Sequence, residues 1–206
     1  MLKKARIAVF VSGGGTNLQA LIDAQRAGTL HSGELALVLS SNPGAYALER
    51  AKAAGIPTAV CSRKELGTQE AFESAIHRAL AAHAVHLIVL AGFMSILSAD
   101  FVSWWPKRIL NVHPSLIPSF CGKGYYGLKV HEAALARGVK VTGATVHFVN
   151  EIPDGGEILL QKAVDILPGD TPEALQKRVM EQAEWVLLPR AAELLSAQII
   201  QEKEGV

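Results

Sequence analysis

An amide, an imidazole and a carboxylate stand where the chain could perform acyl-transfer chemistry. Asn111 and His113 flank a single residue, and Asp154 follows later in an Asp-Gly-Gly segment. If the apolar run 108–110 continues as a strand, the side chains of Asn111 and His113 lie on one face. An amide donor and a protonated imidazole can stabilise an oxyanion, and a nearby carboxylate would keep the imidazole charged. The pattern therefore predicts a site for a small electrophile that becomes tetrahedral.

A proline after the histidine favours this interpretation. A single histidine is usually a surface residue or a buried one with satisfied hydrogen bonds, so His113 alone carries little weight. Pro114 disfavours a helical conformation for the residue before it and gives the strand an extended exit. We therefore expect the imidazole at the carboxyl end of a strand, which is where open α/β sheets bind their ligands.

A glycine-rich segment, Ser-Gly-Gly-Gly-Thr-Asn at 12–17, separates the first expected strand from the first expected helix. Glycines let backbone N–H groups approach an anion, and a helix N-terminus adds unpaired donors. The segment lacks the lysine of an ATP-binding loop and the third glycine of a dinucleotide-binding motif. It predicts a phosphate site; the alternative is a tight turn that Thr16 or Asn17 caps. The predicted phosphate ligands are Gly13, Gly14, Gly15, Thr16 and Asn17.

Strand and helix patterns alternate along the chain and predict one α/β domain, in which helices cover a mostly parallel sheet and a long helix closes the fold. No linker or internal repeat interrupts the alternation. Strands are expected at 5–11, 35–40, 58–61, 86–90, 139–149 and 158–166 and in a run that ends at Asn111, and helices at 17–27, 46–54, 71–82, 98–105, 128–137 and 171–195.

Composition limits the partners of the protein. Of the 206 residues, 50% are hydrophobic and 19% charged, with a net charge of +1, so neither nucleic-acid binding nor a disordered tail is expected. The apolar runs are too short for a membrane span, and residues 1–4 lead into a strand without a cleavable signal. Cys61 and Cys121 suit free thiols in a cytoplasmic protein with no membrane contact.

No metal site is predicted. The remaining histidines fall on different expected elements and form no cluster with metal-ligand spacing. His147 keeps slight interest because it precedes the loop that carries Asp154.

Five segments, in this order and spacing, resemble the folate-dependent phosphoribosylglycinamide formyltransferases over nearly the whole chain: 12–21, 87–97, 110–118, 142–156 and 159–161. The resemblance implies a Rossmann-like formyltransferase fold with helices on both faces of the sheet, as a single domain at 1–206. The half up to residue 100 would bind phosphate, and the half from residue 101 would bind folate and carry the catalytic residues. It also implies transfer of the formyl group of 10-formyltetrahydrofolate, a co-substrate, to the amine of glycinamide ribonucleotide in de novo purine synthesis.

The resemblance assigns roles to individual residues. Asn111, His113 and Asp154 correspond to the catalytic residues: the amide and the protonated imidazole would stabilise the tetrahedral intermediate, and the carboxylate would raise the pKa of His113. Segment 12–17 would bind the acceptor's phosphate. Glu184 would contact the glycinamide and ribose end, although one extra residue between Gly169 and Glu184 leaves a solvated helix face as the alternative. The expected folate contacts are Met94, Ser95, Ile96, Leu97, Asn111, Asn150, Glu151, Ile152, Pro153 and Asp154.

The chain departs from the family pattern in three places. Ser95 and Gln69 stand where many members carry arginine, which would weaken capture of the folate's glutamate tail; the candidates to compensate are Arg63, Lys64, Lys123 and Lys129. The segment 121–127 is longer and richer in glycine than the usual turn, and suits either a mobile flap or an ordinary loop.

Other functions stay open from the sequence. Formyltetrahydrofolate hydrolase usually has an N-terminal regulatory domain, whereas the first expected strand here begins almost at Met1. Methionyl-tRNA formyltransferase would need an RNA-binding domain and a basic surface. A nucleotide-binding module without catalysis is the most distant alternative, since binding alone does not require a buried charge pair. The sequence leaves open whether the protein is a monomer or a homodimer.

Overall fold

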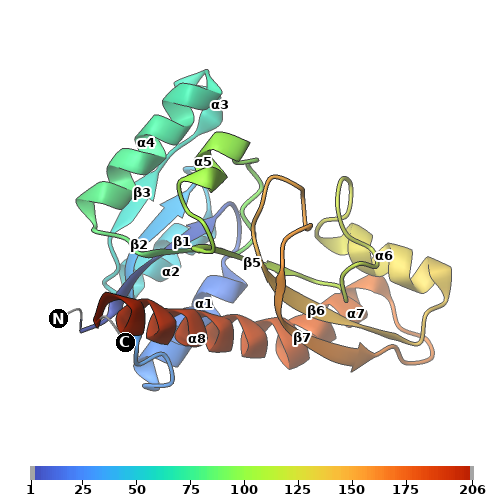
Figure 1. The fold of residues 1–206 in the computed structure, drawn as a ribbon. Coiled ribbons are helices and arrows are strands. Elements are labelled where there is room, and N and C mark those ends of the chain that lie inside the picture. The colour runs from blue at the N-terminus through green and yellow to red at the C-terminus, as the bar shows by residue number, and fades with distance from the viewer. Residues whose placement is uncertain (1–2, 205–206) are drawn as a thin grey trace.

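Seven strands form one twisted sheet with the order β3-β2-β1-β4-β5-β6-β7 (Figure 1). The computed structural model describes residues 3–204. Residues 1, 2, 205 and 206 of the expected domain, and with them the first half of the segment 1–4, lie outside the described residues. The strands from β1 to β5 pair in parallel, whereas β6 pairs antiparallel with both β5 and β7. The strands are β1 Ala5–Val11, β2 Gly33–Ser40, β3 Thr58–Val60, β4 Leu87–Leu90, β5 Ile109–His113, β6 Val141–Phe148 and β7 Ile158–Asp165.

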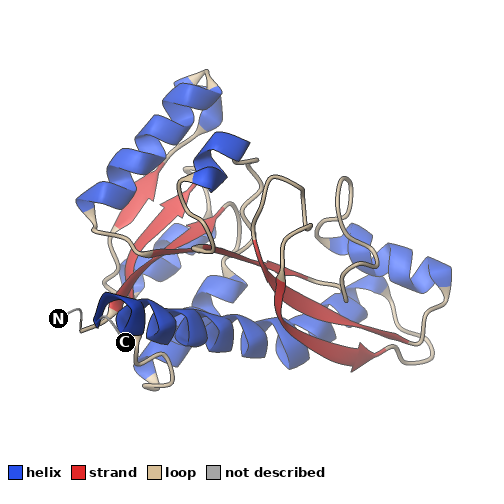
Figure 2. Ribbon diagram, viewed as in Figure 1, coloured by secondary structure: helices blue, strands red, loops and turns tan. Residues whose placement is uncertain are grey.

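Helices cover both faces of the sheet (Figure 2). Alternate residues of β1 enter two different cores: Val9 packs with residues of α1, α2 and α8, and Phe10 with residues of α4 and α5. The expected mostly parallel, helix-covered sheet is confirmed. The helices are α1 Thr16–Arg26, α2 Tyr46–Ala53, α3 Arg63–Leu66, α4 Gln69–Ala82, α5 Ala99–Ser103, α6 Leu128–Arg137, α7 Pro172–Val179, the π-helix η1 Met180–Glu184 and α8 Trp185–Glu204.

The prediction of one continuous closing helix at 171–195 is wrong, both in its continuity and in where it ends. It divides into α7, η1 and α8, and α8 continues to Glu204 because its apolar face extends to the buried Ile199. Pro189 lies inside α8 and has no N–H, so it cannot continue the helical hydrogen bonds toward η1. A π turn holds one more residue than an α turn, and η1 can therefore accommodate the extra residue noted before Glu184.

Two shorter helices also differ from expectation. The helix expected at 98–105 is only α5, because Ser98 lies outside it as a cap that accepts the N–H of Phe101. The single turn α3 was not expected; it contains no buried residue, and so it has no apolar periodicity that could predict it.

The order of the strands determines where a ligand can bind. From β1 the chain moves outward to β2 and β3, and then returns across β1 to β4, so the topological switch lies between β1 and β4. Open α/β sheets bind ligands beyond the carboxyl ends of strands at this point. The segments 12–15, 91–98 and 114–127 follow β1, β4 and β5 there. No helix within residues 3–204 is long and apolar enough to cross a membrane.

Candidate active site

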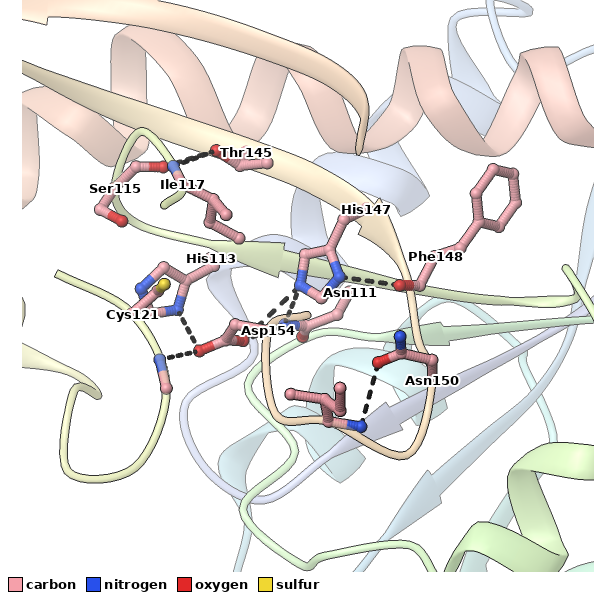
Figure 3. A network of polar contacts seen from close by, with 12 residues as sticks. Asn111, His113, Ser115, Ile117, Cys121, Thr145, His147, Phe148, Asn150 and Asp154 are labelled. Carbon is pink, nitrogen blue, oxygen red and sulfur yellow. Dashed lines mark hydrogen bonds and ion pairs between the residues drawn. The ribbon is translucent and has the colours of Figure 1, made fainter. Parts of the chain in front are cut away.

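The structure brings Asn111, His113 and Asp154, here called the trio, into contact (Figure 3). β5 continues through His113, so the amide and the imidazole project from the same side of one strand. His113 Nδ1 lies 3.5 Å from one oxygen of Asp154, and Asn111 Nδ2 lies 3.5 Å from the other. The carboxylate thus contacts both the amide and the imidazole, the two groups expected to stabilise a developing negative charge.

A tight turn supports the carboxylate. The backbone of Asp154 is left-handed, with φ 57°. The two glycines that follow are required by space: a Cβ on Gly155 would lie 2.7 Å from Ile152, and one on Gly156 would lie 1.7 Å from the carbonyl oxygen of Phe148. The loop is further fixed by Asn150, whose side-chain oxygen accepts the N–H of Ile152 at 3.0 Å. The Asp-Gly-Gly segment therefore turns the chain sharply while it holds Asp154 toward β5.

His147 belongs to the same cluster, although its position in the sequence predicted only a minor role. Its Nε2 lies 3.1 Å from Asn111 Nδ2 and 3.6 Å from Asp154 Oδ1, and its Nδ1 donates to the carbonyl of Phe148 at 2.9 Å. The antiparallel register pairs Asn111 directly with His147. Only this cross-strand register would have identified the residue, and a register cannot be read from one strand's sequence.

The cluster keeps Asp154 ionised. Burial raises the pKa of Asp154, but hydrogen bonds from His147 and from the N–H of Gly122, together with the positive charges of His113 and His147, bring it below the usual value. The Gly122 N–H donates to Asp154 Oδ2 at 2.8 Å. His113 Nε2 lies 2.9 Å from the carbonyl oxygen of Phe120. Both nitrogens of His113 therefore face oxygen acceptors, which suits an imidazolium that donates from both sides.

A cavity of about 180 Å³ opens beside the trio. Every expected folate residue lines this cavity except Met94, which is exposed and whose N–H donates to Ser12 Oγ at 2.9 Å. Gln69 does not line it; its side chain donates to Glu73 and to the carbonyl of Ile96. The lining residues are Leu90, Phe93, Ser95, Ile96, Leu97, Asn111, His147, Val149, Asn150, Glu151, Ile152, Pro153 and Asp154.

The glycine-rich segment 12–17, here called the phosphate loop, lies at the start of α1. Gly15 is the N-cap residue, with φ 74°, and no side chain caps the helix, so the alternative of a turn capped by Thr16 or Asn17 is wrong. A Cβ on Gly15 would lie 2.6 Å from that of Ala47. The first N–H groups of α1 have no partner within the helix, and its first turn contains no acidic residue. The loop therefore has the donors and the local dipole that an anion requires.

Glu184 meets the phosphate loop from η1. Its side chain accepts a hydrogen bond from Asn17 Nδ2 at 2.7 Å and is only 6% exposed, so the alternative of a solvated helix face is wrong. Burial raises the pKa of Glu184, and the hydrogen bond from Asn17 partly opposes that rise. A buried carboxylate in this position can accept hydrogen bonds from hydroxyl groups of a ligand.

Other features lie apart from the trio. A larger cavity of about 710 Å³ lies along α1 and α8; Thr16 of the phosphate loop and Arg50 line it, but none of the trio does. No group of three or more metal-ligating side chains occurs within residues 3–204. Both cysteines are free thiols; burial, and then the charge of Asp154, raises the pKa of Cys121.

The chain is similar to known proteins along most of its length. Residues 5–191 match the family Formyl transferase. The chain is 45% identical over 184 residues to phosphoribosylglycinamide formyltransferase of Haemophilus influenzae, which covers 89% of this chain and 84% of that protein. It is 46% identical over 202 residues to the trifunctional purine biosynthetic protein adenosine-3 of Gallus gallus, covering 98% of this chain. The chain spans only 19% of that protein's length.

Solved structures give the same result. Glycinamide ribonucleotide transformylase 1 from Symbiobacterium toebii superposes with a TM-score of 0.88 at 40% identity, covering 96% of this chain and 90% of that one. A formyltetrahydrofolate deformylase from Pseudomonas syringae superposes with a TM-score of 0.83 at 26% identity, covering 95% of this chain and 62% of that one. Together with the family match along most of the sequence, these similarities show that the chain belongs to the formyl transferase family.

Proposed function

We propose that this protein transfers the formyl group of 10-formyltetrahydrofolate to the amine of glycinamide ribonucleotide, in purine biosynthesis. The observation that carries the proposal is the contact of Asp154 with both Asn111 and His113 beside one cavity, which Asn111 and Asp154 line. The phosphate loop forms the second region of the proposed site. The segment after β4 links the two regions, because Met94 N–H bonds to Ser12 while Ser95, Ile96 and Leu97 line the cavity. A reaction between an anionic acceptor and a folate needs two adjacent sites of this kind.

The chemistry follows from the trio. The neutral amine attacks the formyl carbon and forms a C–N bond, and the formyl oxygen becomes an oxyanion that the Asn111 amide and the His113 imidazolium stabilise. The bond from carbon to the folate nitrogen then breaks, and the proton lost by the amine reaches that nitrogen through water. Asp154 Oδ2 lies 3.5 Å from His113 Nδ1 and would remain paired with the imidazolium through the step. Holding the two substrates in contact can contribute up to about 7–11 kcal/mol.

Folate binding requires some opening of the site. Pockets that bury a drug-sized ligand usually have about 300–1,000 Å³, and the cavity beside the trio has about 180 Å³. In addition, His113 Nε2 contacts the carbonyl of Phe120, just before the flap 121–127. We infer that the flap moves away from His113 as the pterin enters, and that the loop 150–154 adjusts around the ring.

Acceptor binding is assigned to the other region. The phosphate of the ribonucleotide would bind the free N–H groups of residues 13–17, and Glu184 would accept hydrogen bonds from the ribose. The support is the close pairing of Asn17 with Glu184, although they lie 167 positions apart in the chain. We further propose that the protein acts in the cytoplasm as a monomer or homodimer on small-molecule substrates, without a metal.

One assay separates this proposal from a hydrolase. Purified protein would receive 10-formyltetrahydrofolate with and without glycinamide ribonucleotide, and folate absorbance would report the loss of the formyl group. Turnover only with the acceptor supports the transferase. Turnover with water alone would identify a deformylase, and no turnover in either case would refute the proposal. His113→Ala serves as the catalytic control.

A further inference from the structure

Arg50, on α2, joins three elements around the phosphate loop. Its Nε donates to the carbonyl of Gly14 at 2.8 Å, and its Nη1 donates to Gln19 Oε1, on α1, at 3.0 Å. The guanidinium carbon lies 5.1 Å from the centre of the Tyr46 ring. Gln19 is itself oriented by Asp23, which accepts from Gln19 Nε2 at 2.9 Å. The guanidinium is therefore held in one orientation by Gln19 on α1 and by Tyr46 on its own helix, α2.

These contacts determine which way the loop's peptide groups face. The N–H of Ala47 donates to the carbonyl of Gly13 at 3.0 Å, so α2 receives the carbonyls of both Gly13 and Gly14. In a planar trans peptide the N–H points opposite to the carbonyl. The N–H groups of Gly14 and Gly15 therefore point away from α2 and remain available to an anion. Arg50 thus keeps carbonyl oxygen, which would repel a phosphate, on the far side of the loop.

Arg50 also supplies charge. The phosphate loop contains no lysine or arginine. Among the hydrogen bonds within residues 3–204, Arg50 is the one cationic side chain that bonds to the loop. A guanidinium behind the loop attracts a dianion bound in front of it, because charges interact strongly where water is partly excluded.

We propose that Arg50 is a positioning residue that orients the phosphate loop and makes the enzyme selective for phosphorylated acceptors. The inference rests on the proposed function only in naming the acceptor. Arg50 acts through the Gly14 carbonyl and through its charge. Loss of the Arg50 side chain should therefore weaken the recognition of phosphate and leave the folate site unchanged.

The test compares Arg50→Met and Arg50→Lys with the wild type, and uses Lys52→Met as the matched control. Lys52 lies on the same helix but pairs with Glu49 at 2.9 Å and makes no contact with the loop. The acceptors are glycinamide ribonucleotide and its dephosphorylated riboside. Loss of a charge-assisted contact predicts a fall of about 10- to 100-fold in kcat/KM for the ribonucleotide in Arg50→Met. The riboside value and the KM for folate should not change, and Arg50→Lys should fall between.

Binding of inorganic phosphate, measured by calorimetry against chloride at equal ionic strength, tests the same idea without catalysis. Wild type and Lys52→Met should bind phosphate equally, and Arg50→Met should bind it at least tenfold more weakly, by the same estimate. Equal phosphate affinity in all variants would overturn the proposal, as would an equal loss of activity toward both acceptors. If the wild type transfers no formyl group, the proposed function fails, and the phosphate titration still decides the role of Arg50.

Discussion

His131 makes the stability of the protein sensitive to acid. The residue lies on α6 with no exposed surface, and neither ring nitrogen has a hydrogen-bond partner within the described chain. Burial lowers the pKa of His131 from 6.5 to about 4, and the positive charge of His113 contributes to the shift. In the folded protein the ring therefore stays neutral at pH values where the unfolded chain already binds a proton.

The sign and size of the effect follow by linkage. Below pH 6.5 the unfolded state takes up a proton at His131 and the folded state does not, so the free energy of unfolding falls as the pH falls toward 4. Integration between the two pKa values gives a loss of roughly 2 kcal/mol by about pH 5 and roughly 3 kcal/mol by about pH 4. Near neutral pH the effect is absent, because the ring is neutral in both states.

His131→Leu isolates this contribution. Leucine has a similar size, cannot titrate, and leaves no hydrogen bond broken, since the histidine makes none. Urea unfolding followed by circular dichroism would give the free energy of both proteins between about pH 7.5 and about pH 4.5, a range chosen to span the titration. Other titrating groups are common to both proteins and largely cancel in the difference. Parallel stability curves for wild type and variant would refute the reasoning, whereas a gap that widens toward acid supports it.

Three further changes test the site. Asp154→Asn should lower kcat/KM by about 10²- to 10⁴-fold with circular dichroism unchanged, because asparagine tolerates the left-handed backbone but lacks the negative charge that faces His113; a loss of folded structure instead would contradict this. Glu184→Gln should raise the thermal midpoint near neutral pH. Burial raises the pKa of Glu184, so the free energy of unfolding falls as the pH rises from the pKa of the unfolded chain toward that of the folded protein, and glutamine avoids this loss. A lower midpoint would count against the reasoning. The KM for the acceptor should rise in the same variant. Gly15→Ala should cost about 1–3 kcal/mol in urea unfolding, because of its positive φ and the contact with Ala47, whereas Gly13→Ala, which meets no atom within 4 Å, should leave stability nearly unchanged; equal effects would contradict the steric argument.

Local patterns predicted the elements whose ends carry their own signals. The helix expected at 128–137 has those bounds in the structure, because it lies between Gly127 and Gly138, and the latter ends it in a left-handed conformation. The first strand, expected at 5–11 from its β-branched run, also has those bounds in the structure, and the phosphate loop follows it directly. The end of α8 and the π turn were not predictable, because they depend on packing and on Pro189 rather than on a capping residue.

The site shows the same division between local and long-range information. Residue types and spacing predicted that Asn111 and His113 share one face, because they lie two positions apart on one strand, and the resemblance to the family added Asp154 to them. His147 required the register of β5 against β6, which forms only in the folded sheet. Likewise, the contact of Glu184 with Asn17 depends on how η1 packs against α1.

The register matters for catalysis because it orients the Asn111 amide. His147 Nδ1 donates to the carbonyl of Phe148, which holds the ring beside Asn111. His147 Nε2 and Asp154 Oδ1 lie 3.1 Å and 3.5 Å from Asn111 Nδ2 and only 3.6 Å from each other, so both are on the same side of the amide nitrogen and one hydrogen faces both. The other hydrogen diverges from the first and remains free for a formyl oxyanion. The motif supplies the amide donor, and the neighbouring strand determines where its free hydrogen points.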